Sequence, residues 1–166
     1  MRRFIVGFTL MELLVVIAIA ATLAGIAIPS FKAMTESAQR RATATDFYSA
    51  LTRARSEAIA RNSSVSVCAR SASAPDAPAC VSSSNWQGGW IIYSGSTATS
   101  PLLVREAIAN GFTLTGVVSP LVFDASGRIG TPVDYQLCKG AGDSQPRRIR
   151  VSRSGRVSLE LGGTCS

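Results

Sequence analysis

The fold is decided by Gly7-Phe8-Thr9-Leu10-Met11-Glu12-Leu13-Leu14-Val15-Val16-Ile17-Ala18-Ile19, which begins an apolar run of 21 residues from Phe8 to Ile28. Glu12 is the one charged residue in this run, and the basic pair Arg2 and Arg3 precedes it. As a helix the run would be about 31 Å long, which matches the hydrocarbon core of a bilayer. The sequence therefore predicts a membrane-spanning helix.

A basic start followed by an apolar core is also typical of a secretory signal peptide. Such a peptide has small residues at a cleavage site after its apolar core, yet this chain continues there with Ala27-Ile28-Pro29-Ser30-Phe31. The small residue Gly7 comes before the run instead. This order favours a helix that stays attached to the rest of the chain.

Glu12 needs an explanation, because a carboxylate inside a spanning helix costs on the order of 2.5–3.5 kcal/mol on insertion scales. One interpretation places Glu12 near the bilayer edge, where its side chain reaches the polar headgroups. The other interpretation requires a cation close to the carboxylate. The residue type and its position leave both open.

The stretch from Gly7 to Ile19 resembles the class III leader and N-terminal helix of type IV pilins and of the pseudopilins of type II secretion. The resemblance implies that a prepilin peptidase cleaves between Gly7 and Phe8 and methylates the new amine of Phe8. Glu12 then becomes the fifth mature residue, which pairs with the Phe8 amine of a neighbouring subunit during assembly. Pro29 stands where the family places its helix proline.

After Pro29 the apolar residues occupy one face of the predicted helix, while arginines occupy the others. The apolar face consists of Phe47, Leu51, Ala54 and Ala58. We expect Pro29 to kink the helix without ending it, and residues 62–64, Asn-Ser-Ser, to end it. A single helix thus has a membrane half and a packed half.

From Val65 onward the sequence predicts short strands between clusters of Gly, Ser, Pro and Asp. The expected strands are residues 65–69, 89–93, 102–108, 112–117, 121–123, 135–138, 147–151 and 156–161. Residues 70–85, rich in Ser, Ala and Pro, predict an exposed loop.

The predicted fold class is α+β, with a long N-terminal helix packed against a β-rich C-terminal head, as in the pilin fold that the resemblance implies. The expected organisation is a prepilin leader at 1–7, a transmembrane or filament-core helix at 8–28, an amphipathic helix half at 29–62 and a globular head at 63–166.

Four motifs narrow the resemblance to the minor pilins FimT and FimU and to the minor pseudopilin H of type II secretion. In chain order they are Arg55-Ser56-Glu57-Ala58, Trp86-Gln87-Gly88-Gly89-Trp90, Phe123-Asp124-Ala125-Ser126-Gly127-Arg128 and Val151-Ser152-Arg153-Ser154-Gly155-Arg156-Val157. The resemblance implies a structural subunit that takes part in pilus biogenesis and tip assembly. The alternative is a pseudopilin of a type II secretion system.

The same resemblance implies the partners and the location. The partners are other major and minor pilins, prepilin peptidase and the inner-membrane assembly platform. Before assembly the chain would cross the inner membrane once, with its head in the periplasm. After assembly it would belong to a cell-surface pilus or to a periplasmic pseudopilus.

Histidine is absent from the 166 residues, which removes the commonest general base and the usual metal ligand. The acidic residues are dispersed and the sequence has no Gly-rich phosphate loop. We therefore predict that the chain is not an enzyme, with no catalytic residues, no metal and no cofactor.

Four cysteines, an even number in a head outside the inner membrane, predict disulfides. They are Cys68, Cys80, Cys138 and Cys165. Three pairings are open, and proximity favours Cys68 with Cys80 and Cys138 with Cys165. A metal site is the alternative, but the sequence lacks both Cys-x-x-Cys spacing and histidine.

Trp86 and Trp90 flank two glycines and allow two interpretations. They could form an exposed platform on which bases stack. A Trp that starts a strand containing Ile91 and Ile92 more often covers a core, and we favour this second interpretation.

The net charge of +7 gathers near the C-terminus, where residues 139–156 carry six cations and one acid, Asp143, a net of +5 in 18 residues. The cations are Lys139, Arg147, Arg148, Arg150, Arg153 and Arg156. In a strand Arg148 and Arg150 share one face, and a turn at 154–155 would bring Arg153 and Arg156 near them.

This basic stretch has a functional and a structural interpretation. Contact with the phosphates of double-stranded DNA is implied by the resemblance to FimT-type pilins of natural transformation. A solvated edge strand that is protected by its charge is the alternative. The DNA-binding members share a C-terminal Gly-Arg-x-Arg, whereas this chain has Gly155-Arg156-Val157-Ser158.

Overall fold

The computed structural model describes residues 9–71, 79–95, 101–108 and 111–165. Their backbone forms one helix, α1 (Leu10–Arg61), followed by short strands. The chain divides into two compact units, residues 1–39 and residues 40–166, and α1 belongs to both. As expected, α1 continues through Pro29 without ending there.

The first unit holds the apolar half of α1, whose described side chains up to Met34 are exposed. This part of α1 is long and apolar enough to cross a membrane. Its large side chains, among them Leu10, Leu23 and Phe31, cover no core of their own. An exposed apolar helix of this length requires another apolar environment.

The second unit holds the other half of α1, from Arg40 to Arg61, which buries one face. The predicted face is confirmed, since Phe47, Leu51, Ala54 and Ala58 are each fully buried. Ala44 and Ala50 extend it. Small residues on this face bring the helix backbone close to the strands that pack on it.

The helix ends as the sequence predicts. Asn62 has a positive φ of 49°, its N–H donates to the carbonyl of Ile59 at 3.2 Å, and the N–H of Ser63 donates to Ala58 at 3.2 Å. These two bonds satisfy carbonyls of the last turn and form a Schellman motif.

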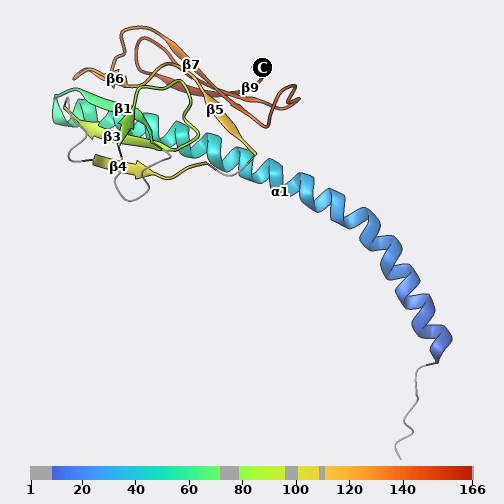
Figure 1. The fold of residues 1–166 in the computed structure, drawn as a ribbon. Coiled ribbons are helices and arrows are strands. Elements are labelled where there is room, and N and C mark those ends of the chain that lie inside the picture. Colours follow the sequence, from blue (N-terminus) through green and yellow to red (C-terminus); the bar gives the residue numbers. More distant parts are fainter. Residues whose placement is uncertain (1–8, 72–78, 96–100, 109–110, 166) are drawn as a thin grey trace, which may run out of the picture. The chain divides into compact units, whose positions relative to one another are not determined.

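Two antiparallel sheets pack with the second half of α1 (Figure 1). The first contains β1 (Val65–Arg70), β2 (Cys80–Val81), β3 (Trp90–Ser94), β4 (Pro101–Arg105) and β6 (Leu121–Phe123), in the order β2-β1-β3-β4 with β6 also paired to β1. The second contains β5 (Thr113–Thr115), β7 (Val133–Cys138), β8 (Arg147–Val151) and β9 (Val157–Leu161), in the order β5-β7-β8-β9.

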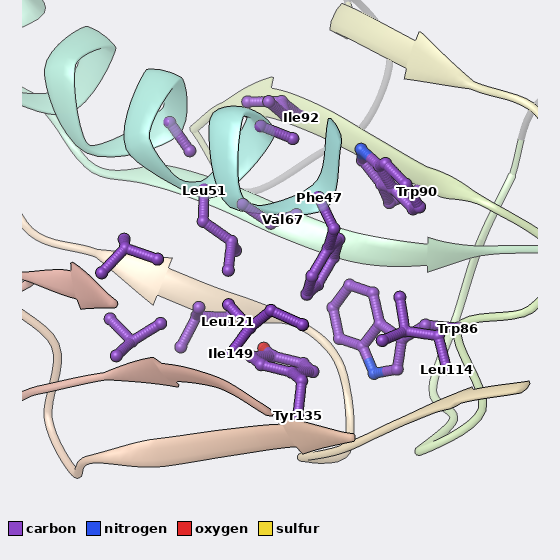
Figure 2. Packing of buried hydrophobic residues seen from close by; sticks show 14 of the residues in the cluster. Phe47, Leu51, Val67, Trp86, Trp90, Ile92, Leu114, Leu121, Tyr135 and Ile149 are labelled. Carbon is purple, nitrogen blue, oxygen red and sulfur yellow. The ribbon is translucent and has the colours of Figure 1, made fainter. Parts of the chain in front are cut away.

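The core joins the helix to both sheets through aromatic rings (Figure 2). Phe47 of α1 meets Trp90 of β3 and Tyr135 of β7, each at 4.9 Å between ring centroids, in edge-to-face geometry. Trp86 completes the cluster, 5.6 Å from Phe47, and its indole N–H donates to the carbonyl of Val117 at 3.1 Å. Such rings contribute both buried area and directional contacts.

The two tryptophans are core residues, because Trp86 is 0% and Trp90 1% exposed. The exposed stacking platform considered from the sequence is therefore wrong. The predicted strands all exist, with shifted ends, but β4 stops at Arg105 and β5 spans only three residues. The expected loop at 70–85 contains the short strand β2, and its residues 72–78 lie outside the described part of the chain.

Disulfides join the pairs that proximity favours. Cys68 of β1 is bonded to Cys80 of β2, with 5.5 Å between their Cα atoms, and Cys138 at the end of β7 is bonded to Cys165, with 5.9 Å. By restricting the unfolded chain, disulfides that close loops of these lengths stabilise the folded state by about 2.9 and 3.6 kcal/mol. The second bond fixes the C-terminal tail to the second sheet.

Candidate functional site

The start of α1 is capped by its own sequence. The backbone N–H of Glu12 donates to Oγ1 of Thr9 at 3.2 Å, so Thr9 is the N-cap and Glu12 the third residue of the helix. Thr-x-x-Glu at this place is the pattern of a capping box, and a carboxylate in the first turn is favoured by the helix dipole. Thr9 and Glu12 in the sequence already carry this capping signal, which was not among the predicted features.

The Glu12 carboxylate is exposed, and no residue in the described part of the chain forms an ion pair with it. Gly7 and Phe8, where we predicted cleavage and methylation, lie outside the described residues. The pairing of Glu12 with a neighbour's amine therefore remains a prediction. The structure adds that the carboxylate is open to such a partner.

Most of the basic stretch lies on β8 and around its ends. Ile149 and Val151 of β8 are buried, and the alternation of a strand places Arg148 and Arg150 together on its opposite face, as expected. β8 lies between β7 and β9, so it is not an edge strand. The interpretation of a charge-protected edge at β8 is therefore wrong, because neighbours satisfy both sides of its backbone.

Arg150 is already paired. Its Nε lies 2.8 Å from Oδ1 of Asp134, and its Nη2 lies 3.2 Å from Oδ2, across the β7–β8 ladder. The hydrogen bonds from Arg150 lower the pKa of Asp134, and Asp134 in turn raises the pKa of Arg150. This pairing reduces the charge that Arg150 can offer to a phosphate.

Arg148 is half-buried on the outer face of the second sheet. Its register neighbours are Gln136 of β7 and Glu160 of β9, so a carboxylate stands on the strand next to it. The C-terminal tail approaches the same face, because a side chain at Gly163 would collide with the Gln136 amide. The sequence could not place Asp134 and Glu160 there, because strand pairing brings them in from other segments.

The remaining predicted cations are spread over the head. Arg147 begins β8, whereas Arg153 and Arg156 lie beyond its other end in an exposed turn. Arg147 and Arg153 lie at opposite ends of β8, whose five residues span about 17 Å. Lys139 follows β7, and its backbone N–H donates to Asp143 at 2.8 Å. The six cations therefore do not form one patch.

Arg153 and Arg156 instead belong to a pair of matching turns. Residues 124–128 and 152–156 both end in Ser-Gly-Arg. In each, the first N–H donates to the carbonyl of the last residue, at 2.9 and 3.0 Å, and the Gly N–H donates back to the first carbonyl at 2.8 Å. Gly127 and Gly155 have nearly equal φ values of 73° and 75°.

The two turns lie against each other and against α1. A side chain at Gly155 would overlap the carbonyl oxygen of Gly127, which accepts a hydrogen bond from Arg55 Nε at 3.2 Å. Arg128 and Arg156 each follow a turn glycine and are exposed. We call this group the paired turns. The repeated Ser-Gly-Arg was the sequence signal that could have added Arg128 to the candidate residues, whereas only the fold brings Arg55 to the turns.

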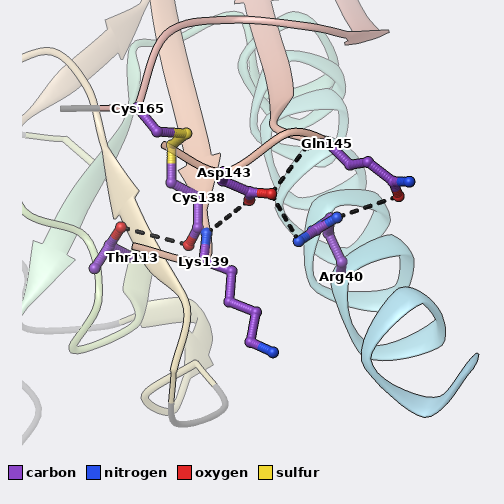
Figure 3. A network of polar contacts seen from close by, with 7 residues as sticks. All are labelled: Arg40, Thr113, Cys138, Lys139, Asp143, Gln145 and Cys165. Atoms are coloured by element: carbon purple, nitrogen blue, oxygen red, sulfur yellow. Dashed lines mark hydrogen bonds and ion pairs between the residues drawn. A yellow bond between two sulfur atoms is a disulfide. The ribbon is translucent and has the colours of Figure 1, made fainter. Parts of the chain in front are cut away.

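A second polar group fixes the loop after β7 to the helix (Figure 3). Asp143 accepts hydrogen bonds from Arg40 Nη2 at 3.0 Å and from the backbone N–H groups of Lys139 and Gln145 at 2.8 and 3.0 Å. Burial alone would raise the pKa of Asp143, but the two backbone donors and the Arg40 charge outweigh it and lower that pKa. Arg40 also lies over the Phe112 ring at 5.8 Å.

With the fold and these residues described, comparison with known proteins identifies the family. Residues 43–155 match the family described as type II transport protein GspH. The chain belongs to the GspH family. The search of curated proteins gave no match.

Two solved structures share the fold of this GspH-family chain. The type IV minor pilin FimU of Pseudomonas aeruginosa aligns with a TM-score of 0.65 at 23% identity, covering 80% of this chain and 99% of FimU. The minor pseudopilin EpsH of the Vibrio cholerae type 2 secretion system aligns with a TM-score of 0.53 at 15% identity, covering 75% and 98%. The chain is thus a FimU- and GspH-like member with the minor pilin or pseudopilin fold.

Proposed function

We propose that this chain is a minor pilin that inserts in the inner membrane and joins other pilins during assembly of a type IV pilus. The observation that carries the proposal is the contrast within α1. The head buries its own face of the helix, while the large apolar side chains that the structure describes before Gln39 are exposed. Other pilin helices, or lipid before assembly, supply what this half lacks.

The mechanism is one of packing and charge neutralisation, without a chemical step by this chain. Prepilin peptidase removes residues 1–7 and exposes the Phe8 amine. The exposed Glu12 carboxylate pairs with that amine on a neighbouring subunit. In an apolar filament core such a pair relieves the cost of an isolated charge.

The alternative is a pseudopilin of type II secretion, since the matched family and EpsH carry that description. A complementation test separates the two. The gene is expressed in a strain that lacks its pilus minor pilin and in one that lacks its secretion pseudopilin. We expect restored pili and unrestored secretion; restored secretion with no pili would replace the proposal by its alternative.

A second candidate function is capture of double-stranded DNA, supported by the paired turns. Arg128, Arg153 and Arg156 are exposed there. Arg128 interacts electrostatically with Asp124 of its own turn, whereas Arg153 and Arg156 form no ion pair with another residue in the described segments. Exposed guanidinium groups on rigid turns bind phosphates without base specificity. Of the residues predicted from the sequence, Arg153 and Arg156 are thus better placed than Arg150.

The test is a titration of the full chain in detergent micelles with duplex DNA at two salt concentrations. Replacing Arg153 and Arg156 by Gln should lower the affinity for DNA about tenfold. The slope of log affinity against log salt concentration should become shallower by about 2, because two phosphate contacts are lost. Replacing Arg148 and Arg150 by Gln is the matched control, with the same loss of charge and a smaller effect. Equal effects of the two double variants would remove the paired turns as the site.

A further inference from the structure

A hollow of about 420 Å³ opens at the end of the head where Arg40 enters the unit. Arg41 of α1 forms one wall, and residues 144–147 form a second. Leu161 and Gly162, at the end of β9, form the third. These segments are far apart in the sequence, and only the fold brings them together.

The charges in this hollow are both positive. Arg41 and Arg147 line it, and no Asp or Glu does so. Within the described ranges the Arg41 guanidinium has no ion pair or hydrogen bond, and Nε of Arg147 is buried without a hydrogen-bond partner. The Nε atoms of Arg40 and Arg148 also lack a hydrogen-bond partner among the described residues, so what distinguishes this hollow is the presence of two guanidinium groups with no lining carboxylate.

The acid nearest in sequence to this wall cannot supply the missing acceptor. Both oxygens of Asp143 are engaged, Oδ1 by Arg40 and Gln145 and Oδ2 by Lys139. The positive charge of the hollow is therefore not neutralised by its own loop. An anion from outside the chain would complete it.

The walls are held in place before any ligand arrives. The Arg40–Asp143 ion pair anchors the loop to α1 (Figure 3), and the N–H of Gly162 donates to the carbonyl of Pro146 at 3.0 Å. The Cys138–Cys165 disulfide holds the chain just beyond Gly162. A site fixed in this way loses little conformational entropy on binding.

One wall of the hollow is apolar, and this favours a peptide over DNA as the ligand. Leu161 is 72% exposed and stands at the rim beside Arg147, its register partner on β8. A DNA backbone needs a row of cations and gains nothing from an exposed leucine. A carboxylate on a peptide, with an apolar residue next to it, matches both parts of the hollow.

We propose that this hollow docks an acidic segment of a neighbouring pilin subunit. The carboxylate of an Asp or Glu pairs with Arg41 and Arg147, and the adjacent apolar side chain packs on Leu161. The inference rests on the proposed function, because it requires that the chain has pilin neighbours. Beyond the proposed function, the inference specifies where one contact with a neighbouring subunit lies and which side chains form it.

The first experiment measures incorporation of the full chain into sheared filaments, relative to its level in membranes. Arg41→Gln should reduce incorporation about tenfold, the scale of one charge-assisted contact, while its membrane level stays unchanged. Arg53→Gln is the matched control, since it removes the same charge about 18 Å further along the same helix. Equal incorporation of wild type, Arg41→Gln and Arg53→Gln would overturn the docking site.

The second experiment identifies the occupant. A photoreactive benzoylphenylalanine at position 161 of the full chain is activated in cells, and the cross-linked peptide is sequenced. We expect a peptide of another pilin-like subunit with Asp or Glu next to an apolar residue, and loss of this product in Arg41→Gln. A peptide without an acid, no product, or a cross-link to DNA would overturn the proposal. Failure of the wild-type chain to enter filaments would instead contradict the proposed function.

Discussion

The two halves of α1 have the same backbone and opposite surroundings. The large apolar side chains that the structure describes between Leu10 and Met34 are exposed, whereas residues 40–61 contribute one face to the core of the head. Phe31 and Phe47 show the difference most directly, with 72% and 0% of their surfaces exposed. One half of the helix thus has its apolar face buried within the chain, whereas the apolar side chains of the other half are left to pack against lipid or another protein.

The largest expected effect comes from truncating the same side chain in each half. Phe47→Ala removes a ring that touches Trp86, Trp90 and Tyr135, so it should lower the free energy of unfolding by about 4 kcal/mol. Phe31→Ala should leave it unchanged. Urea unfolding of the full chain in micelles, followed by tryptophan fluorescence, measures the free energy of unfolding of both variants. Equal losses of stability would contradict the difference between the two halves of α1.

The next effect concerns the paired turns, where Arg55 of the packed half meets the carbonyl of Gly127. Gly155→Ala adds a methyl group at a φ of 75° and into that carbonyl, and should cost about 3 kcal/mol. Gly140→Ala is the control, with a φ of 88° and open space around it, and should cost about 1 kcal/mol. Thermal unfolding of both variants tests this; similar costs would show that the turns are not tightly packed.

A smaller, pH-dependent effect is expected where the packed half begins. Because the pKa of Asp143 is lowered in the folded state, its contribution is present above its ordinary value of 3.8 and lost as the pH falls through the folded-state pKa. Asp143→Asn should therefore destabilise the head by about 2 kcal/mol at pH 7. The difference from wild type should shrink in urea titrations as the pH is lowered below 3.8 and the carboxylate becomes protonated. A constant difference at all pH values would contradict the ionic role of Asp143.

The smallest effect on stability is expected at Glu12, in the bare half. Glu12→Gln should leave the unfolding of the head unchanged, because the carboxylate is exposed and forms no ion pair among the described residues. Its incorporation into filaments should fall about tenfold or more, since the pair with the Phe8 amine is lost. Quantifying the chain in sheared filaments and in membranes checks this. A full loss of the folded head would instead assign Glu12 a structural role.

The helix and its buried face could be predicted because they depend on local periodicity. The helical spacing of Phe47 and Leu51 is enough to predict the packed face of α1. The backbone preference of Asn62 is enough to predict its end. The strands on either side of the predicted turns follow from the same kind of local signal. The disulfide pairing agreed with proximity because both bonds close short segments.

The candidate site could not be predicted in the same way, because its charges are set by strand pairing. Arg150 looks free in the sequence, and only the β7–β8 register brings Asp134 to it. Arg41 and Arg147 are separated by more than a hundred residues and meet at one hollow. The sequence therefore predicted one basic surface, but the fold distributes its cations over four places: the hollow, the outer face of β8, the paired turns and the loop after β7.

The central claim is that the bare half of α1 is the mature N-terminal assembly helix of a pilin. The most direct test is to recover the full chain from membranes of cells with and without prepilin peptidase and to determine its N-terminal residue. We expect a methylated Phe8 with the peptidase present and an uncleaved leader without it. A mature chain that starts at another residue, or cleavage after Ile28 that removes the helix, would contradict it.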